Sequence, residues 1–328
     1  MAFSWRESSL ANIIACARCA EESGVESVWM PEAWGRDAFL ALAAIAQVTD
    51  RVKLGTGIVN VYSRSPATLA MGAATLDELS KGRAILGLGS SGPGVVERWH
   101  GMRYERPLTR VRETVGIIRL ALSGAQTDYQ GSFFHVSDFK LAMDHTNRTI
   151  PIYLAALGPK MLRLAGEVAD GVLLYLCSPP LIPKAIEEAR KGANEAGRSL
   201  ENFDVAALLP AAVSENRSEA RSVVARALAY YVGGMGTYYR RLISESGFAA
   251  EASKISEAWQ RGDRLSATTA VTDQIIDSFA VAGSPDDCRR RLGDFRRSGV
   301  VLPILSLITL DGRGSTDPCE TIKTLMEG

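Results

Sequence analysis

Short apolar segments alternate with longer segments of helical pattern along almost the whole chain, and this alternation limits the fold more than any single motif does. The apolar segments are continuous rather than alternating with polar residues, as expected for strands that are covered on both faces. Strands that alternate with helices imply parallel βαβ units, so we expect an α/β fold, a (β/α)8 barrel. The expected strands are residues 26–30, 52–59, 84–89, 150–155, 171–176, 203–213 and 300–307, with AFSW at residues 2–5 as a short opening strand.

One stretch departs from the alternation. Residues 215–280 have a helical pattern throughout, with breaks at Gly233, Gly234 and Gly236. We interpret this stretch as a helical insertion before the last helix and strand of a single domain over residues 1–328. The other expected helices are residues 9–22, 37–49, 66–80, 106–122, 159–168, 180–196 and 285–298.

Composition excludes several classes of protein. Lys and Arg together number 37, as do Asp and Glu, which argues against a nucleic-acid or acidic-membrane partner. The first residues, MAFSWRESSL, lack the pattern of a secretory signal, and the apolar stretch around 39–46 is far shorter than the roughly 20 residues of a membrane span. Five cysteines in a chain of this kind indicate a reducing compartment. We therefore expect a soluble cytoplasmic protein that acts on a small molecule.

Glycines gather where the expected strands end, at Gly57, Gly87, Gly89 and Gly158. Binding sites of parallel barrels and sheets lie at the carboxyl ends of their strands, and glycine there lets a flat ligand or a phosphate approach the backbone. Residues 87–92 also match G-x-G-x-x-G, but they follow the fourth expected strand and not the first. This position disfavours a nicotinamide dinucleotide site and favours a strand end beneath a bound ring.

Gly158, Pro159 and Lys160 begin an expected helix in a manner that suits an anion. Gly158 can cap the helix and Pro159 suits its first position, while free N–H groups and Lys160 would attract a phosphate. A helix that is merely well capped is the alternative.

Polar residues after the second and third strands are further candidates. Glu32 could be a proton donor or a hydrogen-bond partner; Asp37 could equally cap the next helix, with Arg36 paired to a carboxylate. Asn60 could bind a ring amide or only start a turn.

Two clusters are more ambiguous. Four tyrosines in the helical stretch could pack against one another or line the mouth of a substrate site. Cys16 and Cys19 form a C-x-x-C, but the chain has no second such pair, which favours a structural role over zinc binding. The tyrosines are Tyr230, Tyr231, Tyr238 and Tyr239.

Three stretches carry a resemblance to a known family: RVKLGTGIVNVYSRSPATLAMGAATLDELSKGRAILGLG, IPIYLAALGPKMLRLAGEVADGVLL and DSFAVAGSPDDC. They resemble the bacterial-luciferase-like flavin and deazaflavin oxidoreductases, and within these most closely the coenzyme F420-dependent methylenetetrahydromethanopterin reductases. The similarity runs from about residue 10 to 310, and AALGPKMLRLAGEVADG is its most specific part. It implies a TIM barrel with insertions and a homodimer or larger assembly.

The resemblance also implies roles for individual residues. Gly57–Ile58 stands where the family has a non-prolyl cis peptide that forms a bulge behind the cofactor ring. The helical stretch would border the substrate. The residues implied to contact the cofactor are Gly57, Ile58, Val59, Asn60, Gly89 and Ser90 near the ring, and Ala156, Gly158, Pro159 and Lys160 near its phosphate, while Ser91 matches the loop beside the ring and Arg64 the loop beyond the bulge.

Two positions depart from the family pattern. Phe3 stands where the reductases carry a glutamate, and Glu32–Ala33 where many members have an acidic residue followed by histidine. These departures weaken the case for the methanopterin reaction more than the case for cofactor binding.

The preferred hypothesis is an oxidoreductase that transfers a hydride between coenzyme F420 and a small electrophilic substrate, such as methylenetetrahydromethanopterin or a related pterin. Glu32 and Ser91 are the candidates for hydrogen bonding near the reacting atoms. The alternatives are an FMN-dependent luciferase-like monooxygenase and a non-catalytic flavin-binding protein, with a nicotinamide dehydrogenase more distant. No metal is expected.

Overall fold

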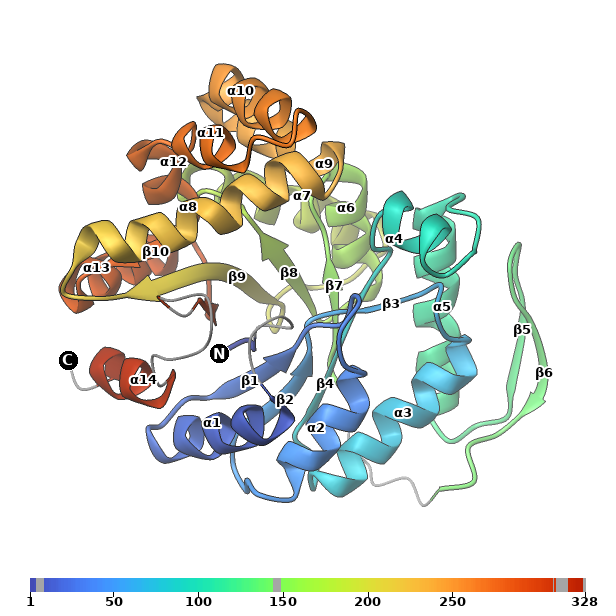
Figure 1. Cartoon of the computed structure of the whole chain (residues 1–328). Coiled ribbons are helices and arrows are strands. Elements are labelled where there is room, and N and C mark those ends of the chain that lie inside the picture. The colour runs from blue at the N-terminus through green and yellow to red at the C-terminus, as the bar shows by residue number, and fades with distance from the viewer. Residues whose placement is uncertain (4–8, 144–148, 309, 311–317, 327–328) are drawn as a thin grey trace. The chain divides into compact units, whose positions relative to one another are not determined.

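The computed structural model describes residues 1–3, 9–143, 149–308, 310 and 318–326 (Figure 1). The chain forms two compact units. The central unit comprises Val25–Leu173 and Glu188–Asp204, and the terminal unit comprises Met1–Gly24, Leu174–Glu187 and Val205–Gly328. Strand β8 (Gly171–Tyr175) and helix α7 (Ile182–Glu195) each contribute residues to both units.

Parallel strands form the core of the central unit, in the order β1-β2-β4-β7-β8. The sequence predicted these strands because their residues are almost all apolar, and Trp29, Leu54, Leu88 and Leu154 are fully buried. Their bounds are β1 (Ser27–Met30), β2 (Lys53–Thr56), β3 (Val59–Asn60), β4 (Ala84–Gly89) and β7 (Ile152–Ala155).

Helices of the central unit begin at residues that the sequence marks as caps. Asp37 accepts a hydrogen bond from Leu40 N at the start of α2, and Ser65 accepts one from Thr68 N at the start of α3. Proline occupies the first turn of α3, α4, α5 and α6. An N–H at this position would have no partner within the helix, so proline, which has none, costs no hydrogen bond there. The bounds are α2 (Ala38–Ala46), α3 (Pro66–Leu79), α4 (Pro93–Arg98), α5 (Pro107–Leu122) and α6 (Pro159–Val168).

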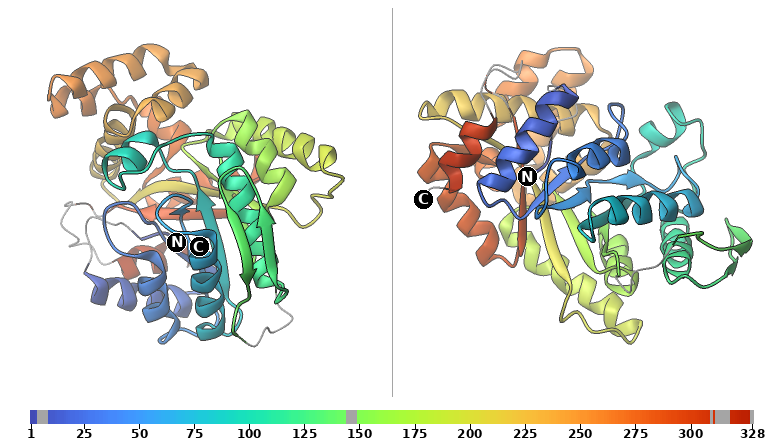
Figure 2. Two further views of the ribbon diagram at one scale, coloured as in Figure 1. Left: turned by 90° about the vertical axis from the view of Figure 1, so that its right-hand side faces the viewer. Right: turned by 90° about the horizontal axis from the view of Figure 1, so that it is seen from below.

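An antiparallel hairpin that the sequence did not predict follows α5. It consists of β5 (Thr127–Gln130) and β6 (His135–Phe139), and it lies beside α5 in the left view of Figure 2. The buried Glu113 carboxylate of α5 accepts hydrogen bonds from the N–H groups of Ser132, Phe133 and Phe134 at the hairpin turn. One side chain therefore fixes the turn against the helix.

Three strands and a long run of helices make up most of the terminal unit. Strand β9 (Asp204–Val213) pairs in parallel with both β10 (Val281–Gly283) and β11 (Leu302–Leu307). Ala2 forms an isolated bridge with Ser306; residues 4 and 5 of the predicted opening strand lie outside the described residues. The three-residue strand β10 was not predicted.

The predicted helical stretch is helical in the structure, and its first helix ends at Gly234. Gly236 has a φ of 88° and leads into the next helix, so the break falls at Gly234 and Gly236 as expected, whereas Gly233 lies within α8. The description of this stretch as an insertion in one domain stays a prediction. The helices are α8 (Arg217–Gly234), α9 (Thr237–Ile243), α10 (Ala249–Gln260), α11 (Arg264–Thr269) and α12 (Asp273–Phe279), with α13 (Pro285–Arg297) after β10.

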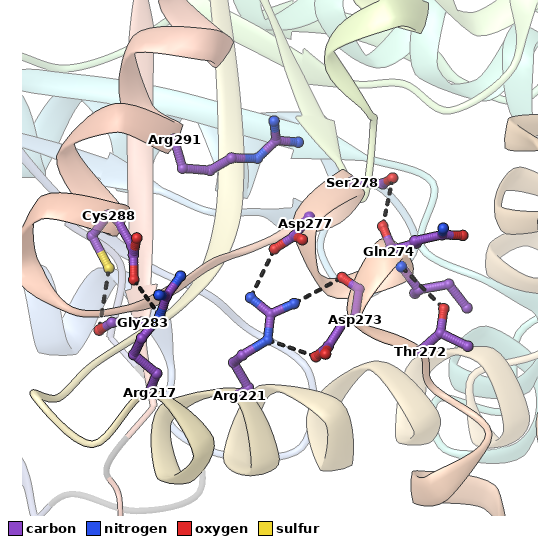
Figure 3. A network of polar contacts seen from close by, with 12 residues as sticks. Arg217, Arg221, Thr272, Asp273, Gln274, Asp277, Ser278, Gly283, Cys288 and Arg291 are labelled. Carbon is purple, nitrogen blue, oxygen red and sulfur yellow. Dashed lines mark hydrogen bonds and ion pairs between the residues drawn. The ribbon is translucent and has the colours of Figure 1, made fainter.

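Ion pairs hold α8 against α12 and α13 (Figure 3). The Arg221 guanidinium donates to Asp273 Oδ1 at 2.7 Å and to Asp277 Oδ1 at 2.8 Å, and Arg217 pairs with Asp287 at 2.7 Å. These residues line a cavity of about 490 Å³. Because its arginines are matched by aspartates, we interpret it as a gap within an ion-pair network; none of the predicted site residues lines it.

A disulfide joins α1 (Leu10–Glu22) to α14 (Pro318–Met326), two helices that lie side by side in Figure 1. It links Cys19 to Cys319, whose Cα atoms are 5.7 Å apart, whereas Cys16 is buried and is not part of a disulfide. Of the two cysteines in the C-x-x-C, one therefore forms a cross-link and the other lies in the core. The sequence did not predict this pairing.

We expect loss of this cross-link to weaken the docking of α14. Under oxidising conditions the Cys19→Ser variant should unfold with a free energy about 2–4 kcal/mol below that of the wild type, measured by urea denaturation. Reductant should lower the stability of the wild type to that of the variant. Cys16→Ser, one turn earlier in α1, is the control and should keep its response to reductant. Equal stability of the oxidised and reduced wild type would contradict the prediction.

Candidate cofactor site

A one-residue bulge separates β2 from β3 where both pair with β4. Gly55 is in register with Ile85, and Val59 is in register with Leu88. The four residue steps from Gly55 to Val59 therefore oppose only three from Ile85 to Leu88. The Thr56 hydroxyl bridges the mismatch. Its Oγ1 accepts from Gly87 N and donates to Gly87 O, both at 2.8 Å, and the residue is fully buried.

The bulge contains the cis peptide bond Gly57–Ile58, which confirms the expectation drawn from the family resemblance. Gly57 N donates to Met30 O at 2.8 Å, which ties the bulge to β1. A Cβ on Gly89 would lie 3.0 Å from Ile58 Cδ1 and 3.2 Å from the Ala155 Cβ. The carboxyl ends of β4 and β7 therefore meet the Ile58 side chain, and together they form a small apolar surface.

Gly87 and Gly89 have different roles. A Cβ on Gly87 would overlap the Thr56 carbonyl oxygen, so this glycine is needed for packing between the strands. At Gly89 the neighbours are the side chains of Ile58 and Ala155, both partly exposed. Both glycines are buried, so a bound ring would meet this strand end through the side chains of Ile58 and Ala155.

Asn60 starts a turn and also contacts a residue that the sequence analysis overlooked. Its Oδ1 accepts hydrogen bonds from Tyr62 N at 2.9 Å and Ser63 N at 2.8 Å, and the residue is 3% exposed. Its Nδ2 lies 3.4 Å from Nε2 of His100, whose ring is exposed. The turn predicted as one alternative is present, and a histidine lies beside it.

Ser90 and Ser91 follow β4 and contact Tyr104, which was also overlooked. Ser90 Oγ lies 3.1 Å from Tyr104 Oη, which donates to Ser91 O at 3.4 Å. Ser91 has a φ of 54°, a left-handed conformation that is uncommon outside glycine. Tyr104 stacks on Tyr62 with ring centroids 5.5 Å apart. The loop beside the expected ring site is thus held from the segment between α4 and α5.

Glu32 takes part in an ion pair with Arg64. The two side chains form two hydrogen bonds of 2.5 and 2.8 Å, and Ala38 N donates to the same carboxylate at 2.9 Å. Arg64 also donates to Asp37, which caps α2. The hydrogen bonding that Arg64 donates to the Glu32 carboxylate is the largest cause that raises the pKa of Arg64. A paired, ionised Glu32 accepts hydrogen bonds and donates none.

The amino end of α6 has the features expected of an anion site. Gly158 caps it in an extended conformation and offers no side chain to the first-turn N–H groups, and Pro159 and Lys160 are exposed. Pro159 has no N–H, and Met161 N and Leu162 N both donate to Gly158 O, so this end offers an anion the positive end of the helix dipole and exposed Lys160. Ala156 is buried, and its N–H donates to Leu173 O.

Two tryptophans lie next to these loops. Trp34, two residues after Glu32, contacts Trp99 edge to face with ring centroids 4.7 Å apart. They are 37% and 50% exposed. This contact and the one between Asn60 and His100 attach residues 99–100 to the segments after β1 and β3.

In the terminal unit, the predicted tyrosine cluster forms and gains a member from β8. The rings of Tyr231 and Tyr239 lie 5.2 Å apart, and Tyr175 lies 4.8 Å from Tyr231. Burial, the largest cause, raises the pKa of the Tyr175 phenol. Tyr230 contacts Tyr231 as well, while Tyr238 is 38% exposed.

Comparisons with known proteins identify the family. Residues 3–302 match the family described as luciferase-like monooxygenase. The chain belongs to this family. It is 35% identical over 286 residues to the 5,10-methylenetetrahydromethanopterin reductase of Archaeoglobus fulgidus, covering 86% of this chain and 85% of the relative. It is 32% identical to a putative coenzyme F420-dependent oxidoreductase of Mycobacterium tuberculosis, covering 92% of each.

A solved structure supports the fold. The chain superposes on the coenzyme F420-dependent tetrahydromethanopterin reductase of Methanopyrus kandleri with a TM-score of 0.83 and 27% identity. The match covers 99% of this chain and 96% of the reductase. The family and the (β/α)8 barrel class predicted from the sequence are both confirmed.

We expect the Thr56 hydroxyl to be essential for the bulge. Thr56→Val keeps the shape of the side chain but leaves the buried N–H and C=O of Gly87 without their partner. This should reduce the free energy of unfolding by about 2–4 kcal/mol in urea denaturation. Thr56→Ser retains the hydroxyl and should lose about 1 kcal/mol or less. Equal stability of the two variants would show that the hydroxyl does not hold the bulge.

Proposed function

We propose that this member of the luciferase-like family is a coenzyme F420-dependent oxidoreductase that transfers a hydride between the deazaflavin and a small electrophilic substrate. The substrate would present a C=N, C=C or C=O group; methylenetetrahydromethanopterin and related pterins are candidates. The main support is the bulge at Gly57–Ile58, where backbone and small side chains from neighbouring strand ends form one surface. Relatives over most of the chain's length have names that state F420 dependence or methylenetetrahydromethanopterin reduction.

The described residues fit a planar cofactor with a charged tail. The partly exposed side chains of Ile58 and Ala155, which pack over Gly89, offer an apolar contact to a ring. The amino end of α6, where no side chain caps the helix, and exposed Lys160 suit a phosphate. When bound, the deazaflavin would supply the hydride chemistry. The residues that would hold it are Gly57, Ile58, Val59, Asn60, Gly89 and Ser90 around the ring, and Ala156, Gly158, Pro159 and Lys160 around the tail.

Glu32 and Ser91 remain the proposed residues near the reacting atoms. The ion pair with Arg64 suits Glu32 to accept a hydrogen bond and to organise the loops after β1 and β3, rather than to donate a proton. Ser91 would offer its hydroxyl from a backbone conformation held by Tyr104.

An FMN-dependent monooxygenase is the second candidate, because the matching family is described as monooxygenases. It would bind FMN more tightly than F420 and consume oxygen. A flavin-binding protein without catalysis would bind a coenzyme and turn over nothing.

Other expectations from the sequence stay predictions. A small-molecule substrate agrees with the names of the reductase relatives. No helix among the described residues is long and apolar enough to cross a membrane. Cytoplasmic location and a homodimer or larger assembly stay predictions.

Titration of the purified protein with F420 and with FMN, followed by fluorescence, tests the choice of cofactor. We expect tighter binding of F420, and Lys160→Ala should weaken it roughly threefold to tenfold by removing a charge beside the tail. Lys53→Ala removes a lysine from the amino end of β2 and is the matched control. Absence of F420 binding, or tighter binding of FMN, would overturn the proposal.

Kinetics of Glu32→Gln test the role of the ion pair. Loss of one carboxylate charge should lower kcat by about tenfold through the loops that it organises, while the Kd of F420 stays within about twofold. Glu167→Gln breaks a similar bidentate pair, with Arg112, elsewhere in the central unit and should leave kcat unchanged. An unchanged kcat in Glu32→Gln removes Glu32 from the mechanism.

A further inference from the structure

The orientation of the Asn60 side-chain amide is determined by the backbone. Its Oδ1 accepts from the N–H groups of both Tyr62 and Ser63, at 2.9 and 2.8 Å. Turning the amide over would place its NH2 group against these two donors and lose both bonds. The group that faces His100 is therefore the Nδ2 donor, 3.4 Å from His100 Nε2.

A donor on one side of the contact requires an acceptor on the other. With His100 Nε2 as the acceptor in this contact, the tautomer that fits carries its N–H at Nδ1. A protonated ring would bring two donors face to face. Asn60 is 3% exposed, so few water molecules can separate the groups.

This imidazole belongs to the edge of the central unit where the candidate cofactor site lies. Asn60 is in register with Gly89 at the carboxyl ends of β3 and β4. Trp99, the neighbour of His100, contacts Trp34 after β1. His100 is an exposed residue beside a buried partner, so its side chain is accessible to a ligand. The other described histidine, His135, lies in the β5–β6 hairpin.

We propose that His100 is a neutral hydrogen-bond donor to the substrate, acting through Nδ1–H, and that the substrate is therefore a carbonyl or an imine rather than an isolated alkene. The inference rests on the proposed function. As a hydride adds to the carbon and forms the new C–H bond, the electron pair of the C=O or C=N bond moves to the heteroatom. Nδ1–H stabilises the charge that develops there. The heteroatom then takes a proton from water, and His100 keeps its own.

The tautomer can be measured without coenzyme. The wild-type protein with 15N-labelled histidine should show, by NMR at neutral pH, a protonated Nδ1 and an unprotonated Nε2 for His100, with the signal assigned by His100→Gln. In Asn60→Asp the second carboxylate oxygen accepts a hydrogen bond, so the proton should appear on Nε2. A wild-type ring that carries its proton on Nε2 overturns the proposal.

Kinetics with reduced F420 test the substrate class, using cyclohexanone, 1-pyrroline and cyclohexene as ketone, imine and isolated alkene. His100→Phe should lower kcat on the ketone or imine by roughly 100-fold, with the Kd of F420 unchanged. His100→Gln keeps an N–H donor and should stay within about tenfold of the wild type, and His135→Phe should match the wild type.

Three outcomes overturn the assignment: a His100→Phe variant as fast as the wild type, a wild type that consumes neither ketone nor imine, or a wild type that reduces only the alkene. Failure of the wild type to bind F420 is seen separately in the titration. It would overturn the proposed function, and this inference with it.

Discussion

The hydrogen bonds between the Thr56 hydroxyl and the backbone of Gly87 hold the candidate site together. A parallel ladder that gains one residue on one strand loses the regular partners of at least one peptide group on the other. Here one buried hydroxyl satisfies both groups of Gly87. The strand resumes as β3 in a shifted register, and Ile58 reaches Gly89 and Ala155 because of that shift. Without the hydroxyl, the N–H and C=O of Gly87 would be buried without these partners. A β2 without the bulge would then be favoured, and Ile58 would not lie at this place.

Strands and helices with strong local signals could be predicted from the sequence, and weaker ones could not. The run AILGLG is strand β4 with the predicted bounds, and Gly158 and Pro159 mark the start of α6. Strand β10 has three residues and no pattern of its own, because its position depends on pairing with β9. The hairpin β5–β6 has partly exposed, polar strands, and its turn depends on Glu113 from another element.

The same distinction holds for the candidate site. Gly57, Gly89 and Gly158 could be recognised because parallel strands bring their carboxyl ends together. Arg64 lies 32 residues from Glu32, so the sequence could not show which arginine holds that carboxylate. His100 and Tyr104 follow α4, in a segment without periodicity, and only the folded chain brings them to Asn60 and Ser90. The sequence alone does not show which residue a polar side chain in a loop will contact, because that depends on how the chain folds.

The surface beneath the expected ring rests on the buried glycines of β4, and this has a consequence for how the protein could change its reactant. Mutation cannot change a peptide group, and a glycine such as Gly87, which has no room for even a methyl group, cannot be replaced without displacing its neighbours. Variation in selectivity must then come from the loops above, above all from residues 99–104, which rest on a few side-chain contacts. Laboratory evolution of a new specificity should therefore target residues 99–104, while the strand ends of β2, β3 and β4 stay the same.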